Sequence, residues 1–91
     1  MPEQRARYGQ SAISDSEPTL IVSADLECRE GVQLKSMNTN TDVIYIGESD
    51  VDATSGFPLL PGEGLFVPID HVSSTYALAG VDTERLAWAV I

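Results

Sequence analysis

Short apolar runs recur along the chain from Thr19 onward, and glycine, asparagine, aspartate and serine separate them. In GVQLKS, residues 31–36, the apolar Val32 and Leu34 alternate with polar residues. This period of two places the apolar side chains on one face of a β-strand. Similar runs elsewhere are rich in Val, Ile, Leu and aromatic residues, as strands are. The pattern predicts six strands, at 19–23, 31–36, 43–47, 64–69, 75–78 and 84–91.

The individual runs add detail to this prediction. VIYIG, residues 43–47, is apolar on both faces, which is typical of a strand in the middle of a sheet. Pro68 has no N–H to donate, so residues 64–69 should lie at a sheet edge or end there. A helix from Asp82 or Thr83 remains an alternative for residues 82–90. The alternation of large and small residues to the C-terminus favours a strand.

Strands of this length at spacings of roughly ten residues predict an all-β fold. We expect a small antiparallel β-sandwich or jelly-roll-like barrel of six to eight short strands. Residues 1–18 are polar, and we interpret them as a flexible or extended N-terminal arm outside the core. Residues 19–91 then form a single β domain. The shared alternation predicts these core residues: Leu34, Tyr45, Val67, Tyr76, Leu86 and Trp88.

The length of 91 residues corresponds to one domain near the lower limit for an unaided core. Small domains often gain support from disulfides, metals or a partner subunit. The single cysteine, Cys28, excludes an internal disulfide, and its apolar context predicts a small buried side chain. We therefore expect an oligomer, in which subunit contacts bury further apolar area.

Charge and hydropathy limit the partners. The chain has 14 acidic and 5 basic residues, a net charge of −9, and this charge disfavours nucleic-acid binding. No apolar run approaches the ~20 residues of a membrane-spanning helix, so no membrane partner is expected. The N-terminus has no apolar signal-peptide core, which predicts synthesis in a cytoplasm without secretion.

Two segments suggest chemistry. Asp70–His71 holds the only histidine, but adjacent residues on an extended strand point to opposite faces and no GxSxG elbow is present. One His and one Cys do not make a structural zinc site. We predict a protein that is not an enzyme and has no cofactor.

The acid-rich segment 48–52 invites comparison with an EF-hand calcium loop. If Asp50 takes the first position, Ser55 falls where glycine is required and Pro61 falls where the closing glutamate is required. The motif fails. We interpret these residues as solvated loop acids, although a cation site of another kind near Asp50 and Asp52 stays open.

The loop FPLLPGE, residues 57–63, places large apolar side chains among turn-forming residues. Its prolines and glycines limit the freedom of the backbone. In one interpretation Phe57 and Leu59 fold back to cap one end of the core. In the other, some of Phe57, Leu59 and Leu60 are exposed anchors at a subunit interface. Both hold if neighbouring residues point in opposite directions.

Residues 28–91 resemble a pattern in small virion proteins of tailed bacteriophages: GV-L, then N…VYVG, then GFPL-PGE, then a tyrosine-containing strand. The matching residues are Cys28, Gly31, Val32, Leu34, Asn40, Val43, Tyr45, Gly47, Gly56, Phe57, Leu59, Pro61, Gly62, Glu63 and Tyr76. The resemblance is to capsid decoration, or cement, proteins. It implies a β-sandwich that binds the outer capsid surface, commonly as a homotrimer, with the major capsid protein as partner.

This resemblance gives a functional hypothesis. The chain would be a structural virion protein that stabilises the head. The alternative is a tail, fibre or baseplate module that binds a host-surface ligand. Arg5 and Arg7 form the only basic segment of the chain, and with Tyr8 they should contact the capsid. The predicted interface residues are therefore Arg5, Arg7, Tyr8, Phe57, Leu59 and Leu60.

Overall fold

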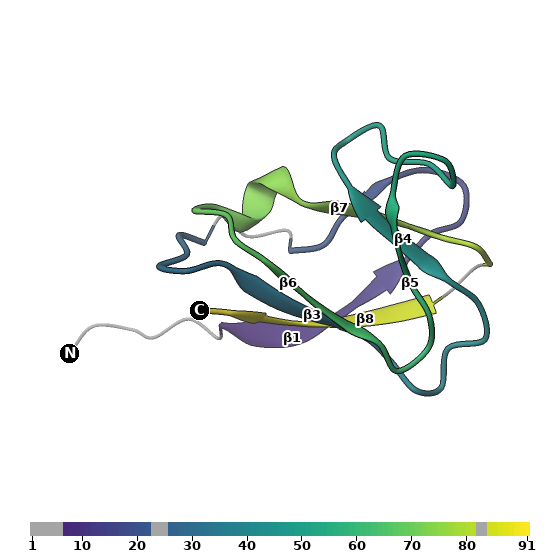
Figure 1. Cartoon of the computed structure of the whole chain (residues 1–91), viewed down its shortest axis with the longest axis horizontal. Coiled ribbons are helices and arrows are strands. Elements are labelled where there is room, and N and C mark those ends of the chain that lie inside the picture. Colours follow the sequence, from purple (N-terminus) through teal and green to yellow (C-terminus); the bar gives the residue numbers. More distant parts are fainter. Residues whose placement is uncertain (1–6, 23–25, 82–83) are drawn as a thin grey trace.

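The computed structural model describes residues 7–22, 26–81 and 84–91 and shows an all-β chain (Figure 1). Two antiparallel four-stranded sheets pack face to face, as the sequence predicts. A single 3₁₀ turn, η1 (Val72–Ser74), interrupts the strands. The strands are β1 (Tyr8–Ile13), β2 (Thr19–Leu20), β3 (Val32–Ser36), β4 (Ile44–Gly47), β5 (Phe57–Leu59), β6 (Gly64–Val67), β7 (Tyr76–Ala79) and β8 (Glu84–Val90).

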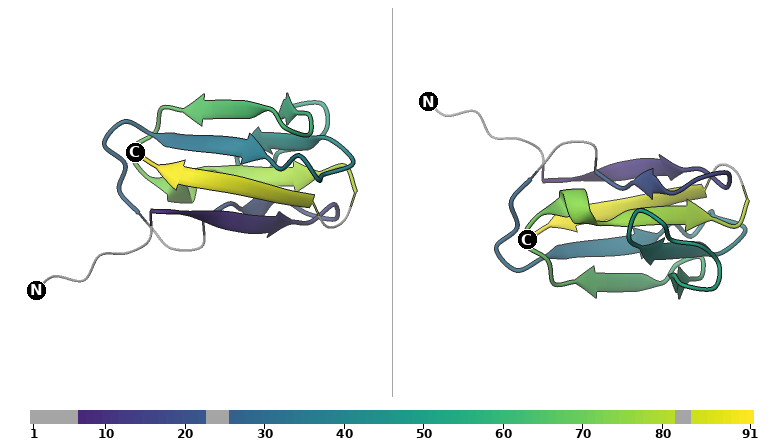
Figure 2. Two further views of the ribbon diagram at one scale, coloured as in Figure 1. Left: turned by 90° about the horizontal axis from the view of Figure 1, so that it is seen from below. Right: turned by 90° about the horizontal axis from the view of Figure 1, so that it is seen from above.

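The strand order is that of a jelly roll. Sheet A has the order β1-β8-β3-β6, and sheet B has the order β2-β7-β4-β5. The first strand therefore pairs with the last, the second with the seventh, the third with the sixth and the fourth with the fifth. Figure 2 shows sheet A from its outer side on the left and sheet B on the right. The chain is thus a long hairpin rolled into two layers.

The core lies between the sheets and follows the alternation along the strands. Leu34 and Leu86 are fully buried on the inner face of sheet A, and Ile44 and Ala77 are fully buried on that of sheet B. Cys28 is buried too, as its apolar context predicts. Val67 and Trp88 pack against this core while keeping part of their surface exposed. These positions confirm the predicted alternation for Leu34, Leu86, Val67 and Trp88.

Two predicted core residues lie on the wrong face. Tyr45 alternates with the buried Ile44 and Ile46, and Tyr76 precedes the buried Ala77. Both tyrosines therefore lie on the outer face of sheet B, and both are half-buried. VIYIG is apolar on both faces, so the sequence did not distinguish the inner face from the outer one.

The predicted arm is wrong for the residues of β1. Tyr8–Ile13 pairs with β8 along its whole length, and Ile13 is fully buried in the core. Gly9 lies opposite Trp88, and a Cβ atom at Gly9 would lie 2.9 Å from Cζ2 of the indole. The indole N–H of Trp88 donates to the hydroxyl of Ser11 at 3.2 Å. The small residues Gly9 and Ser11 of β1 thus leave space for the indole ring of Trp88 on β8.

A polar clamp joins the β3–β4 connection to the start of β8. The side-chain amide of Asn40 donates to the backbone carbonyl of Arg85 at 2.7 Å and accepts from its N–H at 2.9 Å. The buried Glu84 carboxylate accepts from the N–H and the hydroxyl of Thr41, at 2.9 and 3.1 Å. The buried carboxylate is therefore hydrogen-bonded, as a buried charge must be.

The two open sides of the sandwich differ. On the β1–β2 side, the Ser11 hydroxyl donates to the carbonyl of Ile21, and the N–H of Ala79 donates to the carbonyl of Ser14. These bonds join the two sheets. On the opposite side the edge strands are β5 and β6, and an apolar cleft remains between them. No helix among the described residues is long and apolar enough to cross a membrane.

Candidate interaction surfaces

The outer face of sheet A holds no acidic side chain at any strand position. Its register places Tyr8, Ala89, Gln33 and Phe66 in one row across the four strands. The neighbouring outward positions are Gln10, Ala12, Lys35, Gly64, Arg85 and Ala87. Tyr8 is 74% exposed and Phe66 is 40% exposed, at opposite ends of the row. The face is therefore flat in the middle, aromatic at two edges and positively charged.

The outer face of sheet B is partly covered by its own chain. Val51, in the β4–β5 connection, is 3% exposed, yet it lies outside the main core cluster. A Cβ atom at Gly47 or at Gly56 would lie 2.8 or 2.7 Å from Cγ2 of Val51. The connection therefore folds back over β4, and the two glycines leave room for Val51.

The β5–β6 cleft has a volume of about 390 Å³ and a mostly apolar lining, with Glu48, Ser74 and Thr75 as its polar members. Phe57 is 55% exposed at its edge, and Phe66 reaches it from β6. Leu65, Val67 and Ile69 line its floor. Exposed aromatic side chains beside an apolar cleft are typical of a protein–protein contact.

A fixed turn joins β5 to β6 beside this cleft. The N–H of Glu63 donates to the carbonyl of Leu60 at 2.9 Å, and Pro61 and Gly62 occupy the two central positions. Gly62 has φ +87°, so the turn has the Pro–Gly pattern of type II. The Glu63 carboxylate accepts from the N–H of Leu60 at 2.9 Å. Leu60 is thereby held at 56% exposure.

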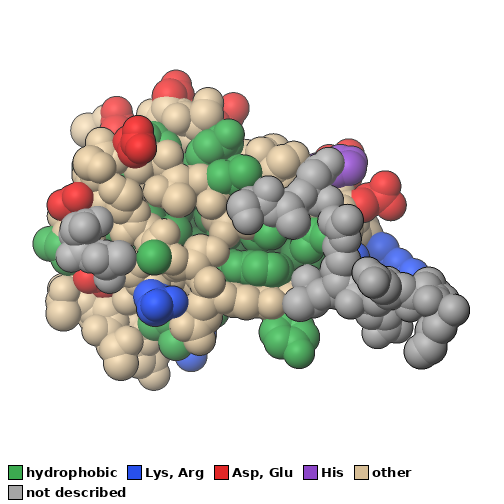
Figure 3. Space-filling model, turned by 180° about the vertical axis from the view of Figure 1, so that it is seen from behind, with side chains coloured by type: hydrophobic (Ala, Val, Ile, Leu, Met, Phe, Trp, Pro, Cys, Tyr) green, Lys and Arg blue, Asp and Glu red, His purple; other side chains and the backbone are tan. Residues whose placement is uncertain are grey.

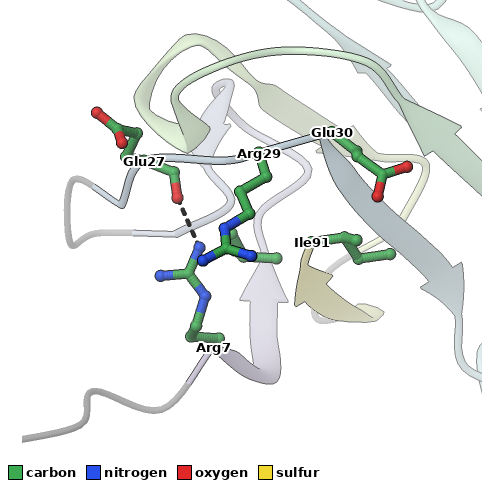
Figure 4. Close-up of a pocket in the computed structure, with 6 residues that line it drawn as sticks. Arg7, Glu27, Arg29, Glu30 and Ile91 are labelled. Carbon is green, nitrogen blue, oxygen red and sulfur yellow. Dashed lines mark hydrogen bonds between the residues drawn. The ribbon is translucent and has the colours of Figure 1, made fainter.

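A polar pocket lies at the end of the sandwich near the C-terminus. Its lining includes Arg7, Arg29, Glu27 and Glu30 (Figure 4). Arg7 donates from Nη2 to the backbone carbonyl of Glu27 at 2.6 Å. In Figure 4 the side chain of Arg29 extends toward Arg7, and the two carboxylates point away from both. The lining therefore balances two cationic against two anionic side chains, with the two guanidinium groups side by side.

The structure separates the predicted interface residues. Phe57 and Leu60 are exposed on the β5–β6 side, whereas Arg7 and Tyr8 lie at the start of β1 on the far edge of sheet A. Leu59 is 1% exposed and belongs to the core, so it offers no surface to a partner. Both interpretations of the loop therefore hold in part, because Leu59 points into the core and Leu60 is exposed. Arg5 lies outside the described residues.

The acid-rich loop is organised by its own hydrogen bonds. Oδ1 of Asp52 accepts from the N–H and the hydroxyl of Thr54 and from the N–H of Ser55, at 2.7–2.9 Å. These bonds, with those of Thr54 the largest, lower the pKa of Asp52 from 3.8 to about 2. Asp52 therefore closes a turn. In the part of the chain that the structure describes, no group of three or more His, Cys, Asp or Glu residues is placed to hold a metal ion.

The Asp70–His71 segment has a structural part in the fold. His71 forms an isolated antiparallel bridge with Glu27 and precedes η1. The hydroxyl of Ser74 donates to the backbone carbonyl of His71 at 2.9 Å, so it closes the 3₁₀ turn. The expectation that the chain is not an enzyme remains a prediction.

The Asn40–Thr41–Glu84 clamp and the acid-free face of sheet A were not foreseen from the sequence. Both depend on residues that only the strand pairing brings together, such as Lys35 on β3 and Arg85 on β8.

No family model matches the chain, and comparisons with curated proteins and with solved structures find no significant match.

Proposed function

We propose that this chain is a structural protein of a tailed-bacteriophage virion, a decoration protein that binds the outside of the head as an oligomer and stabilises it. The proposal starts from the resemblance of residues 28–91 to such proteins. Its support in the structure comes from the surfaces that the matching residues build.

The observation that carries the proposal is the form of GFPLLPGE. Its residues make the edge strand β5 and the type II turn, and they leave Phe57 and Leu60 exposed beside an apolar cleft. A turn fixed by Pro61, Gly62 and Glu63 holds an apolar side chain in solvent at little further entropic cost on binding. Such a surface suits a permanent contact with the shell or with a neighbouring subunit.

The fold adds support of a weaker kind. Jelly rolls recur in viral capsid proteins, although they also occur in lectins and cupins, and a fold alone does not define a function. The size adds a second reason, because a 91-residue chain with one cysteine has a small core. Burial of Phe57 and Leu60 against a partner would add apolar area at about 25 cal/mol per Å².

The start of β1, with Arg7 and the exposed Tyr8, is a second contact in this proposal. Arg7 is held at the start of β1 by its bond to the carbonyl of Glu27, and Tyr8 is exposed beside it. Both residues therefore project from a fixed strand. With Arg5 they would meet an acidic region of the capsid protein.

The decisive experiment is cryo-electron microscopy of virions that contain the chain, beside particles assembled without it. Extra density on the outer surface of the head supports the proposal. Density confined to the tail would replace it with the fibre or baseplate alternative. Particles that are identical with and without the chain would contradict both.

A binding assay tests the surface itself. Phe57→Ala with Leu60→Ala should lower occupancy on heads that lack the chain, measured by pelleting. Val81→Ala is the matched control, because Val81 is an exposed apolar residue of the β7–β8 connection and does not line the cleft. Full occupancy by the double variant would remove the cleft from the contact.

A further inference from the structure

The acidic residues of this chain are unevenly placed. There are 14 of them, yet none of the outward strand positions of sheet A carries one. The charged side chains on that face are Lys35 and Arg85, which are both exposed. Lys35 lies opposite Ala87, two residues along β8 from Arg85, so the two cations are diagonal neighbours on adjacent strands.

The opposite side of the sandwich carries the complementary charge. Glu48, Asp50 and Asp52 are all exposed in the β4–β5 connection, which covers the outer face of sheet B. The buried Val51 packs against Gly47 and Gly56 and so fixes this segment. The carboxylates of Asp50 and Asp52, on either side of Val51, are exposed. In Figure 3 several acidic side chains lie along the upper edge, on the side of sheet B, and basic ones lie low on the left, on the side of sheet A; both kinds also occur at the right-hand end.

We infer that copies of this chain bind one another head to tail, with the outer face of sheet A of one copy against the Glu48–Asp52 loop of the next. The charges of the chain complement each other in this arrangement and in no face-to-face pairing of sheet A. A symmetric contact of two such faces would bring Lys35 and Arg85 close to their own copies.

The neutral residues of the face supply the apolar contact area that the charged residues lack. Exposed ion pairs contribute about 0.2–1 kcal/mol each and are screened over about 8 Å at physiological salt. Tyr8 and Phe66 at the ends of the row, Ala89 between them and Ala87 in the neighbouring row add apolar area. Charge therefore selects the partner surface, and apolar contact stabilises the pair.

This contact requires no virion component. It would be one way to form the oligomer of the proposed function. A head-to-tail contact closes into a ring if successive copies are rotated and otherwise continues as a filament. Because it forms between purified copies, its failure is distinguishable from failure to bind a phage head.

The test uses three charge variants and sedimentation velocity across a concentration series. Lys35→Glu with Arg85→Glu should weaken self-association at least about tenfold, since two attractions become repulsions. Glu48→Lys with Asp50→Lys should weaken it to a similar extent. The variant that combines all four changes should associate again, because each surface then meets its new opposite.

The combined variant separates this contact from a symmetric one. In a face-to-face dimer of sheet A, the four changes would place glutamates against glutamates and restore nothing. Glu17→Lys, which alters the charge of an exposed residue in the β1–β2 connection, should leave association unchanged. Circular dichroism checks the fold, and Lys35→Gln with Arg85→Gln provides a milder version of the first variant. A wild-type monomer at 100 µM, or a combined variant that stays monomeric while the wild type associates, would overturn the inference.

Discussion

The outer faces of the two sheets differ in how far the chain itself covers them. Sheet B is partly covered by its own chain, since the β4–β5 connection buries Val51 over Gly47 and Gly56, and Gly56 lies close to Tyr45. Sheet A has no such cover among the described segments, and Figure 2 shows its four strands unobstructed. The chain thus covers part of one outer face itself and leaves the other open.

The residue types follow this division. The covered face has glycines where Val51 needs space and tyrosines that stay half-buried. The open face has alanines in the middle and aromatic side chains at its edges. Most described acidic residues lie in the loops, and none lies at an outward strand position of the open face.

The largest effect should come from Ile13, which ties β1 to the core of sheet A. Ile13→Ala removes a fully buried side chain and should lower the free energy of unfolding by about 2–5 kcal/mol. Urea denaturation measures it, with the exposed neighbour change Ala12→Ser as the control. A loss below about 0.5 kcal/mol would mean that residues 8–13 are an arm after all, as their sequence suggests.

The next largest effect should come from the polar clamp that joins the β3–β4 connection to the start of β8. Glu84→Ala leaves the donors of Thr41 without their buried acceptor and should cost about 1–3 kcal/mol. Glu84→Gln keeps one acceptor and should cost less. Equal losses for the two variants would show that the hydrogen bonds to Thr41 contribute little.

A smaller loss is expected on the covered face. Val51→Ala removes two buried methyl groups and should destabilise the fold by about 1.5 kcal/mol. Hydrogen exchange should also rise in the β4–β5 connection. Ala53→Ser, at an exposed position of the same loop, is the control. An unchanged stability would mean that the connection does not cover sheet B in solution.

The smallest effect is local and concerns the acidic loop. The hydrogen bonds from Thr54 and Ser55 lower the pKa of Asp52 from 3.8 to about 2. A lowered folded-state pKa stabilises the turn at pH values above 3.8, and this contribution disappears as the pH falls through about 2. Carbon-13 NMR titration should show this midpoint, and Thr54→Ala should raise it toward 3.8. A midpoint near 3.8 in the wild type would contradict the turn geometry.

Much of the fold was predictable from the sequence, because six of the eight strands appear in it as short apolar runs. The strand β1 did not, since Gly9 and Ser11 on its inner face are small to accommodate Trp88. That requirement arises from a partner strand far away in the sequence. The strand β5 was missed because its three residues include Pro58, which looks like part of a loop.

The candidate surfaces were less predictable. The turn residues around Leu60 identified the exposed loop, but burial separated Leu59 from its neighbour. The acid-free face appears only when Lys35 and Arg85 are placed on adjacent strands. Outward positions on four separate strands share no local pattern, so a single sequence does not reveal them.

The central claim, that the outer face of sheet A is the open contact face, is tested most directly by hydroxyl-radical footprinting over a range of protein concentrations. In dilute solution Tyr8 and Phe66 should react strongly and Tyr45 weakly. As copies associate, Tyr8 and Phe66 should lose reactivity together while the reactivity of Tyr45 stays low. If Tyr8 and Phe66 remain fully reactive at concentrations where sedimentation shows oligomers, the contact lies elsewhere and the claim is contradicted.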